Sequence, residues 1–165
     1  MKKCIILQIN YLILICLFIP CVAIAQPICQ IQRFSAYNGL AQRSVTNILQ
    51  DSKGFIWFST WNGLNKFDGY TFKNYKAFPG DGCTLTSNRL AKITQTQTCD
   101  IWCQTYDLRI YLFDSRREKF IDILRPYENE KQQTYAVQNV YTLPKGVSWI
   151  VCDRGAFRID EQAYK

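Results

Sequence analysis

Residues 53–68 read KGFIWFSTWNGLNKFD, and residues 145–160 read KGVSWIVCDRGAFRID. The two stretches align without a gap, so Trp57 in the first falls at the same place as Trp149 in the second. Each carries a short apolar run, then a polar turn, then a second short run, as strands joined by tight turns do. The pair therefore predicts an internal structural repeat.

A looser third copy lies between these two. Residues 100–107 read DIWCQTYD, after which Leu108 stands where the other copies have glycine, and the closing aromatic arrives one residue late. The tryptophans of the three copies, Trp57, Trp102 and Trp149, are 45 and 47 residues apart. One such string could recur by chance in an aromatic-rich chain, but three copies in register exclude that reading. A period of about 40 to 50 residues with strand-like content is typical of β-propeller blades.

Alternating apolar residues separated by turn residues predict the strands of these blades. The first blade is expected to hold residues 45–50, 55–60, 63–67 and 70–75. The second is expected to hold residues 90–95, 101–105, 108–113 and 119–124, and the third residues 136–142, 147–152 and 155–159. Nine places before each tryptophan, an aliphatic residue is expected on the inward face of the first strand: Ile48, Ile93 and Val140.

The fold class predicted from these strands is all-β. We expect a partial β-propeller, with about three blades of four-stranded antiparallel sheet, after an N-terminal signal peptide. The expected divisions are the signal peptide 1–25, an N-terminal strand and loop 26–43, blade one 44–86, blade two 87–134 and an incomplete blade three 135–165. Trp57, Trp102 and Trp149 are expected to form the core between blades. The strand within 26–43 is expected to close the ring by completing a last blade that this chain does not contain.

The first residues have the features of an export signal. Lys2 and Lys3 supply a basic start, residues 11–19 an apolar run, and residues 23–25 a small-x-small cleavage site before Gln26. The apolar run is short for a membrane span, which leaves a retained anchor as the weaker alternative. We therefore expect a mature chain that begins at Gln26 and lies in the periplasm or outside the cell.

Net charge and cysteine content limit which ligands and cross-links the sequence predicts. The formal charge is +7, and loss of Lys2 and Lys3 with the signal leaves +5. This net charge is too small to predict nucleic-acid binding, and the basic residues are interspersed with acidic ones. Outside the signal the chain has five cysteines, an odd number that leaves at least one unpaired within the chain. They are Cys29, Cys83, Cys99, Cys103 and Cys152. Their pairing stays open.

The residue inventory also limits the chemistry. The Cys99-x3-Cys103 pair invites a metal site, but structural zinc takes four ligands and the chain has no histidine, so buried thiols on strands are the preferred reading. Neither a metal nor any cofactor is expected. Without histidine there is no imidazole base and no phospho-accepting histidine, so no kinase chemistry is expected in this chain.

Three segments resemble a known family. Residues 34–40 (FSAYNGL), 44–51 (SVTNILQD) and 54–70 (GFIWFSTWNGLNKFDGY) are similar to the start of the sensor region of hybrid two-component regulators. The resemblance covers nearly all of residues 30–160 and is weakest in blade two, at Leu108. It implies periplasmic two-component regulator propeller repeats, followed in the parent by a β-sandwich, a membrane helix, a histidine kinase and a response regulator. It also implies sensing of oligosaccharides from polysaccharide breakdown.

Length is the main departure from that family, because such a sensor is far longer than 165 residues. We expect the chain to be an N-terminal fragment of an inner-membrane-anchored parent, with the remaining blades, the β-sandwich and a second copy of the parent as candidate partners. A non-functional truncated product and a deliberately short accessory protein are the alternatives. A fragment of three blades would leave sheet edges and faces uncovered.

The rim that carries the second turn of each blade is the candidate binding site. In an antiparallel meander that turn shares an end with the inter-blade connections. The candidate residues are Trp61, Asn62, Tyr106, Asp107, Asp153 and Arg154. Aromatic rings and hydrogen-bonding groups together suit the faces and hydroxyls of sugars, although Asn and Asp are also common in turns for backbone reasons.

Two function classes remain open on these grounds. The first is a binding and signalling module. The second is a fragment of a secreted propeller enzyme, a lyase or glycosidase, which would need paired carboxylates or an imidazole facing the ring centre. No such arrangement is evident in this sequence, so we expect a non-catalytic sensor.

Overall fold

The structure is a computed structural model that describes residues 29–78, 85–128 and 134–163. The predicted signal peptide 1–25 and Cys83 lie outside the described residues. Every strand belongs to the compact unit that begins at Arg33. Within the described residues, none of the helices is long and apolar enough to span a membrane.

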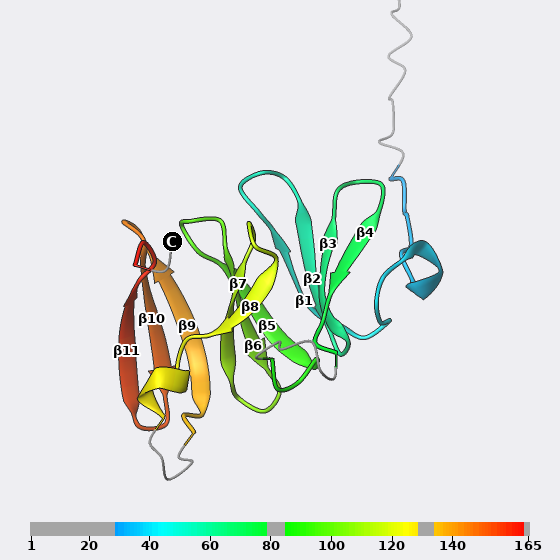
Figure 1. Ribbon diagram of the computed structural model, residues 1–165. Coiled ribbons are helices and arrows are strands. Elements are labelled where there is room, and N and C mark those ends of the chain that lie inside the picture. The colour runs from blue at the N-terminus through cyan, green and yellow to red at the C-terminus, as the bar shows by residue number, and fades with distance from the viewer. Residues whose placement is uncertain (1–28, 79–84, 129–133, 164–165) are drawn as a thin grey trace, which may run out of the picture. The chain divides into compact units, whose positions relative to one another are not determined.

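Eleven strands form three antiparallel sheets (Figure 1). The first sheet contains β1 (Val45–Gln50), β2 (Ile56–Thr60), β3 (Gly63–Phe67) and β4 (Phe72–Tyr75). The second contains β5 (Leu90–Gln95), β6 (Ile101–Thr105), β7 (Ile110–Asp114) and β8 (Lys119–Asp122), and the third contains β9 (Val137–Leu143), β10 (Val147–Cys152) and β11 (Gly155–Asp160). Neighbours in each sheet are neighbours in the chain, so every sheet is a meander, as a blade requires. The all-β, blade-like fold and the existence of all eleven predicted strands are confirmed.

Strand register makes the three tryptophans equivalent. Each lies on the second strand of its sheet, eight residues after its partner on the first strand; the pairs are Leu49 with Trp57, Thr94 with Trp102, and Tyr141 with Trp149. On the third strand the partners are Lys66, Leu112 and Arg158. The offset to the third strand is one residue longer in the second sheet. The late closing aromatic seen in the sequence is therefore an insertion in the β6–β7 turn.

The β6–β7 turn accommodates that insertion with a leucine in a conformation that favours glycine. The β2–β3 and β10–β11 turns end at Gly63 and Gly155, which have φ of +99° and +137°. Leu108 has φ of +61°, in the left-handed region where a side chain is unfavourable by about 1–2 kcal/mol. Its carbonyl accepts a hydrogen bond from the Val137 amide at 2.7 Å, which ties the turn to the third sheet.

We expect Leu108→Gly to stabilise the chain by about 1 kcal/mol, because it relieves this backbone strain and Leu108 is 47% exposed. Leu108→Ala is the matched control: it removes the same side chain but keeps Cβ, so it should give no such gain. Urea unfolding of the two variants beside the parent chain measures the difference. Equal stability of the glycine and alanine variants would show that Leu108 carries no backbone strain.

Burial between the sheets follows the same register. The Trp57 ring stacks on Tyr75 with centroids 6.0 Å apart and meets Phe113 of the second sheet edge-on at 5.7 Å. Trp102 lies in a second buried cluster with Val140 and Ile150 of the third sheet. These two tryptophans are 2% and 1% exposed, so each is core against the sheet that follows it.

Trp149 departs from the expected burial, since it is 38% exposed although it occupies the same register position. Ile48 shows the mirror case: Ile93 and Val140 are 4% and 7% exposed, but Ile48 is 60% exposed. The physical reason is shared. A second-strand tryptophan is covered by the following sheet and a first-strand aliphatic by the preceding one. Within the described residues no sheet follows the third or precedes the first.

Within the unit that begins at Arg33, the residues before β1 pack on the first sheet without joining it. Residues 29–35 carry no strand, and Ala36–Asn38 forms a single 3-10 turn. The Phe34 ring contacts Phe67 with centroids 4.8 Å apart, and the Ala41 amide donates to the fully buried Asn65 side chain at 2.7 Å. The segment therefore covers part of the face on which Ile48 lies. Its role as a ring-closing strand stays a prediction.

Candidate functional site

The second turns of the three sheets are held in the same way. In each, the first turn residue donates its amide to the residue just before the first strand of its own sheet: Trp61 to Ser44, Tyr106 to Arg89, and Asp153 to Ala136, at 3.3, 3.0 and 3.0 Å. This spacing of 17 residues is the same in all three sheets. The turns thus lie at the end where the chain enters each sheet, as predicted, and we call this end the rim.

The rim brings Trp61 and Tyr106 together. Their ring centroids are 6.1 Å apart and their planes meet at 85°, so an indole of the first sheet and a phenol of the second form a corner. The two side chains are 44% and 52% exposed. Arg89 completes the cluster, with its guanidinium carbon 5.4 Å from the centre of the Trp61 ring. Sequence reasoning missed Arg89, although its place directly before the predicted strand 90–95 put it at this end of the sheet.

Two flanking candidates have more local roles. Asn62 makes its hydrogen bonds within the first sheet and its entry segment. Its backbone N–H donates to Thr60 Oγ1 at 3.1 Å, and its side-chain amide donates to the Ala41 carbonyl at 3.4 Å. Asp107 is exposed, and its Oδ2 accepts a hydrogen bond from Thr86 Oγ1 at 2.9 Å. Asn62 therefore shapes the turn, whereas Asp107 adds an exposed carboxylate beside Tyr106.

The β10–β11 turn differs from the other two in chemistry. Asp153 Oδ1 accepts from the Ala136 amide at 3.1 Å, and its Oδ2 lies 3.6 Å from Arg154 Nε. This turn carries a charged pair and no aromatic residue, so the aromatic corner belongs to the first and second sheets.

Two mostly buried ion pairs that share Arg109 anchor the turn on which Tyr106 lies. Arg109 lies 2.7 Å from Asp122 and 2.6 Å from Glu128. Burial alone lowers the pKa of Arg109, but the hydrogen bonds to Glu128 and Asp122 outweigh it and raise that pKa, so the guanidinium stays charged. The Arg109 carbonyl also accepts from the Thr105 amide at 3.0 Å, which fixes the turn on which Tyr106 sits.

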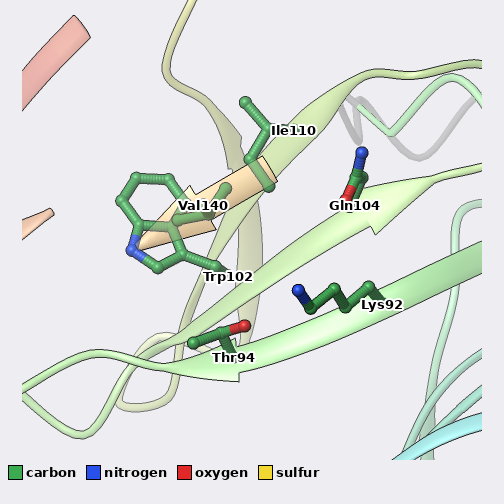
Figure 2. Close-up of a pocket in the computed structure, with 6 residues that line it drawn as sticks. All are labelled: Lys92, Thr94, Trp102, Gln104, Ile110 and Val140. Carbon is green, nitrogen blue, oxygen red and sulfur yellow. The ribbon is translucent and has the colours of Figure 1, made fainter. Parts of the chain in front are cut away.

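Between the second and third sheets there is a small cavity (Figure 2). It is lined by Lys92, Thr94, Trp102, Gln104, Ile110 and Val140. Its volume is about 10 Å³, which is room for one water molecule and not for a sugar. Lys92 Nζ donates to Asn139 at 2.9 Å and Gln104 donates to the Val137 carbonyl at 2.7 Å, so its polar groups hold the two sheets together.

Four described cysteines are free thiols: Cys29, Cys99, Cys103 and Cys152. Cys103 and Cys152 are buried, as the strand reading expects, and burial raises the pKa of both, with Asp153 adding to the effect at Cys152. Cys99 is partly buried with its sulfur 3.3 Å from Ser52 Oγ. Among the described residues, no three His, Cys, Asp or Glu side chains gather as a metal site would require.

Comparison with known proteins supports the blade reading. The model of the two component regulator propeller family matches residues 39–62. A 53-residue stretch is 47% identical to the histidine kinase P4 of Formosa agariphila, covering 32% of this chain and 4% of that protein.

Solved structures match more of the chain. The extracellular domain of a hybrid two-component system of B. thetaiotaomicron aligns over 80% of this chain and 19% of its own length, with 26% identity and a TM-score of 0.64. A second extracellular domain from that organism covers 73% of this chain and 17% of its own, with 23% identity and a TM-score of 0.52, a likeness of fold alone. The chain thus spans less than a fifth of these domains. Residues 39–62 thus match a two-component regulator propeller repeat, in a chain whose sheets are similar to the extracellular domain of a hybrid two-component system.

Proposed function

We propose that this chain is the N-terminal part of a ligand-sensing propeller of a hybrid two-component regulator, and that its rim binds oligosaccharides. The repeat at residues 39–62 and the likeness to extracellular domains of two-component systems support the sensing role. The function is binding and signalling, not catalysis. The location that fits is the periplasm or the cell exterior, with export directed by residues 1–25 and the parent anchored in the inner membrane.

The observation that carries the ligand class is the corner formed by Trp61 and Tyr106. Buried aromatic residues need no ligand, but these two are each about half exposed, touch one another across two sheets and sit on turns. An aromatic face packs against the C–H face of a sugar ring, and adjacent polar groups bond its hydroxyls. Two perpendicular rings offer one face for stacking and one edge for an adjoining unit, which suits an oligosaccharide.

The remaining partners belong to the parent protein. The exposed Trp149 face is where a further blade would pack, by analogy with Trp57 and Trp102. A β-sandwich domain and a second copy of the parent are the other partners of this proposal.

We expect Trp61→Ala and Tyr106→Ala each to weaken oligosaccharide binding about tenfold or more, because each removes an exposed aromatic anchor. The probes are neutral and acidic oligosaccharides of defined length on an array, followed by titration calorimetry with the full chain. Tyr70→Ala is the matched control, since Tyr70 is 91% exposed but lies on the β3–β4 turn at the opposite end of the sheet. Binding that survives both rim variants would refute the rim as the site.

A further inference from the structure

We infer that the rim site prefers acidic oligosaccharides, and that Arg89 binds their carboxylate or sulfate group. This inference rests on the proposed saccharide-binding function and deepens it. It comes from three observations: where the Arg89 side chain lies, what its charge is paired with, and what the neighbouring rings leave accessible.

The position of Arg89 is fixed by its backbone. Its amide donates to Ser87 Oγ at 3.2 Å, and its carbonyl accepts the Tyr106 amide at 3.0 Å. Its side chain then lies over the Trp61 indole, with the guanidinium carbon 5.4 Å from the ring centre. Arg89 is thus held by the turn that presents Tyr106 while it covers the ring of Trp61, and it belongs to the corner rather than to a separate surface.

The charge of Arg89 is not neutralised by an ion pair within the described residues. Arg109, by contrast, is paired with acidic residues. It lies four residues after the end of β6 and contacts two carboxylates at 2.6 and 2.7 Å. The exposed carboxylate of Asp107 accepts its hydrogen bond from Thr86 instead. Among the described residues, therefore, no carboxylate is paired with the positive charge of this guanidinium.

The geometry of the guanidinium favours an anion over a hydroxyl. The guanidinium of Arg89 makes a cation–π contact with the Trp61 ring at 5.4 Å, and such a contact does not use up its five N–H donors. Those donors form a fork that matches the two oxygens of a carboxylate or sulfate. A sugar unit stacked on Trp61 or Tyr106 would place its acidic substituent at that edge. The cation–π contact with the indole also restrains Arg89, which reduces the entropy lost when it binds.

The test compares charged probes with an uncharged one. Oligogalacturonate carries a carboxylate on every unit, and its methyl ester keeps the same sugar backbone without the charge; a sulfated carrageenan oligosaccharide supplies the sulfate arm. Binding to the full chain is measured by titration calorimetry at low and high salt. We expect acidic probes to bind and the ester to bind at least about tenfold more weakly, with affinity for the acid falling as salt rises.

Variants at Arg89 assign the effect. Arg89→Gln should weaken acid binding about tenfold and so reduce the difference in affinity between the acid and the ester, and Arg89→Lys should recover part of that difference because the charge returns without the fork. Since Arg89 is exposed, neither variant should alter unfolding by urea. Binding by either the carboxylate or the sulfate arm supports the inference and identifies the group.

The contrary results are separable. If the ester binds as tightly as the acid and both depend on Trp61, or if Arg89→Gln has no effect, the acidic preference is wrong and the rim's saccharide function stands. If no probe binds, or if Trp61→Ala and Tyr106→Ala leave all binding unchanged, the rim function fails and this inference fails with it.

Discussion

Trp57→Ala is expected to lower the free energy of unfolding by about 3–5 kcal/mol, the largest single effect predicted for this chain. The side chain is 2% exposed and packs against Tyr75 and Phe113, so truncation opens a cavity between the first and second sheets. It also removes the indole N–H that donates to Asp51 Oδ2 at 2.8 Å, leaving a mostly buried carboxylate with one partner fewer. Urea unfolding followed by circular dichroism measures the loss.

Two other tryptophans serve as matched controls for that loss. Trp149→Ala changes the same residue at the same register position, but on a face that is 38% exposed, so it should cost clearly less than Trp57→Ala in this chain. Trp61→Ala on the exposed rim should cost under about 1 kcal/mol and act mainly on ligand binding. Equal costs for Trp57 and Trp149 would mean that packing between sheets does not determine which tryptophan matters.

The fold was predictable because its signals are local. Short stretches of sequence predict the strands, the turns and the 45- to 47-residue period. Even the insertion in the second blade can be seen in the sequence, where Leu108 stands in place of glycine. Strand ends moved by a few residues at most, as at β4, which begins at Phe72 rather than at residue 70. A repeat of this kind needs no long-range information to be recognised.

Burial and side-chain pairing between sheets were harder to predict from the sequence. Trp149 and Trp57 lie at aligned positions of the repeat, but a following sheet covers Trp57, whereas none covers Trp149 in the part of the chain that the structure describes. Arg89 lies far from Trp61 in sequence, and no pattern in either segment indicates that the guanidinium covers the indole. Polar contacts of this kind depend on how one sheet is rotated against the next, which a period alone does not fix.

The clearest example is the partner of the second core tryptophan. In the first sheet the indole of Trp57 donates to Asp51 in its own β1–β2 turn. In the second sheet the equivalent turn position is Thr96, and the indole of Trp102 donates instead to Ser148 Oγ of the third sheet at 2.9 Å. The two indoles therefore bond to different acceptors: Asp51 lies in the turn of the same sheet, whereas Ser148 lies on the following sheet, where the residue equivalent to it in the second sheet is Ile101.

That contact continues to a buried carboxylate. Ser148 Oγ donates to Glu161 Oε1 at 2.5 Å, and the Gln97 amide of the second sheet donates to Glu161 Oε2 at 2.8 Å. Glu161 is 4% exposed, and Ser148 and Trp102 are 0% and 1% exposed. The backbone amide of Glu161 donates to the Gly146 carbonyl at 2.9 Å, which fixes Glu161 beside the turn before β10. The buried Glu161 thus joins the second and third sheets through its two carboxylate oxygens.

Glu161→Ala is therefore expected to cost about 1–3 kcal/mol, because it leaves the buried Ser148 hydroxyl without an acceptor, whereas Gln97 is exposed and its amide can turn to water. Glu161→Gln is the matched control: its amide keeps the size of the side chain and one carbonyl oxygen, so it can satisfy one donor and should cost about half as much. Urea unfolding gives both values. A loss of stability in Glu161→Gln as large as in Glu161→Ala would show that the charge, not the pair of acceptors, holds the sheets together. No loss in either variant would mean that apolar packing around Trp102 and Val140 is sufficient to dock the third sheet.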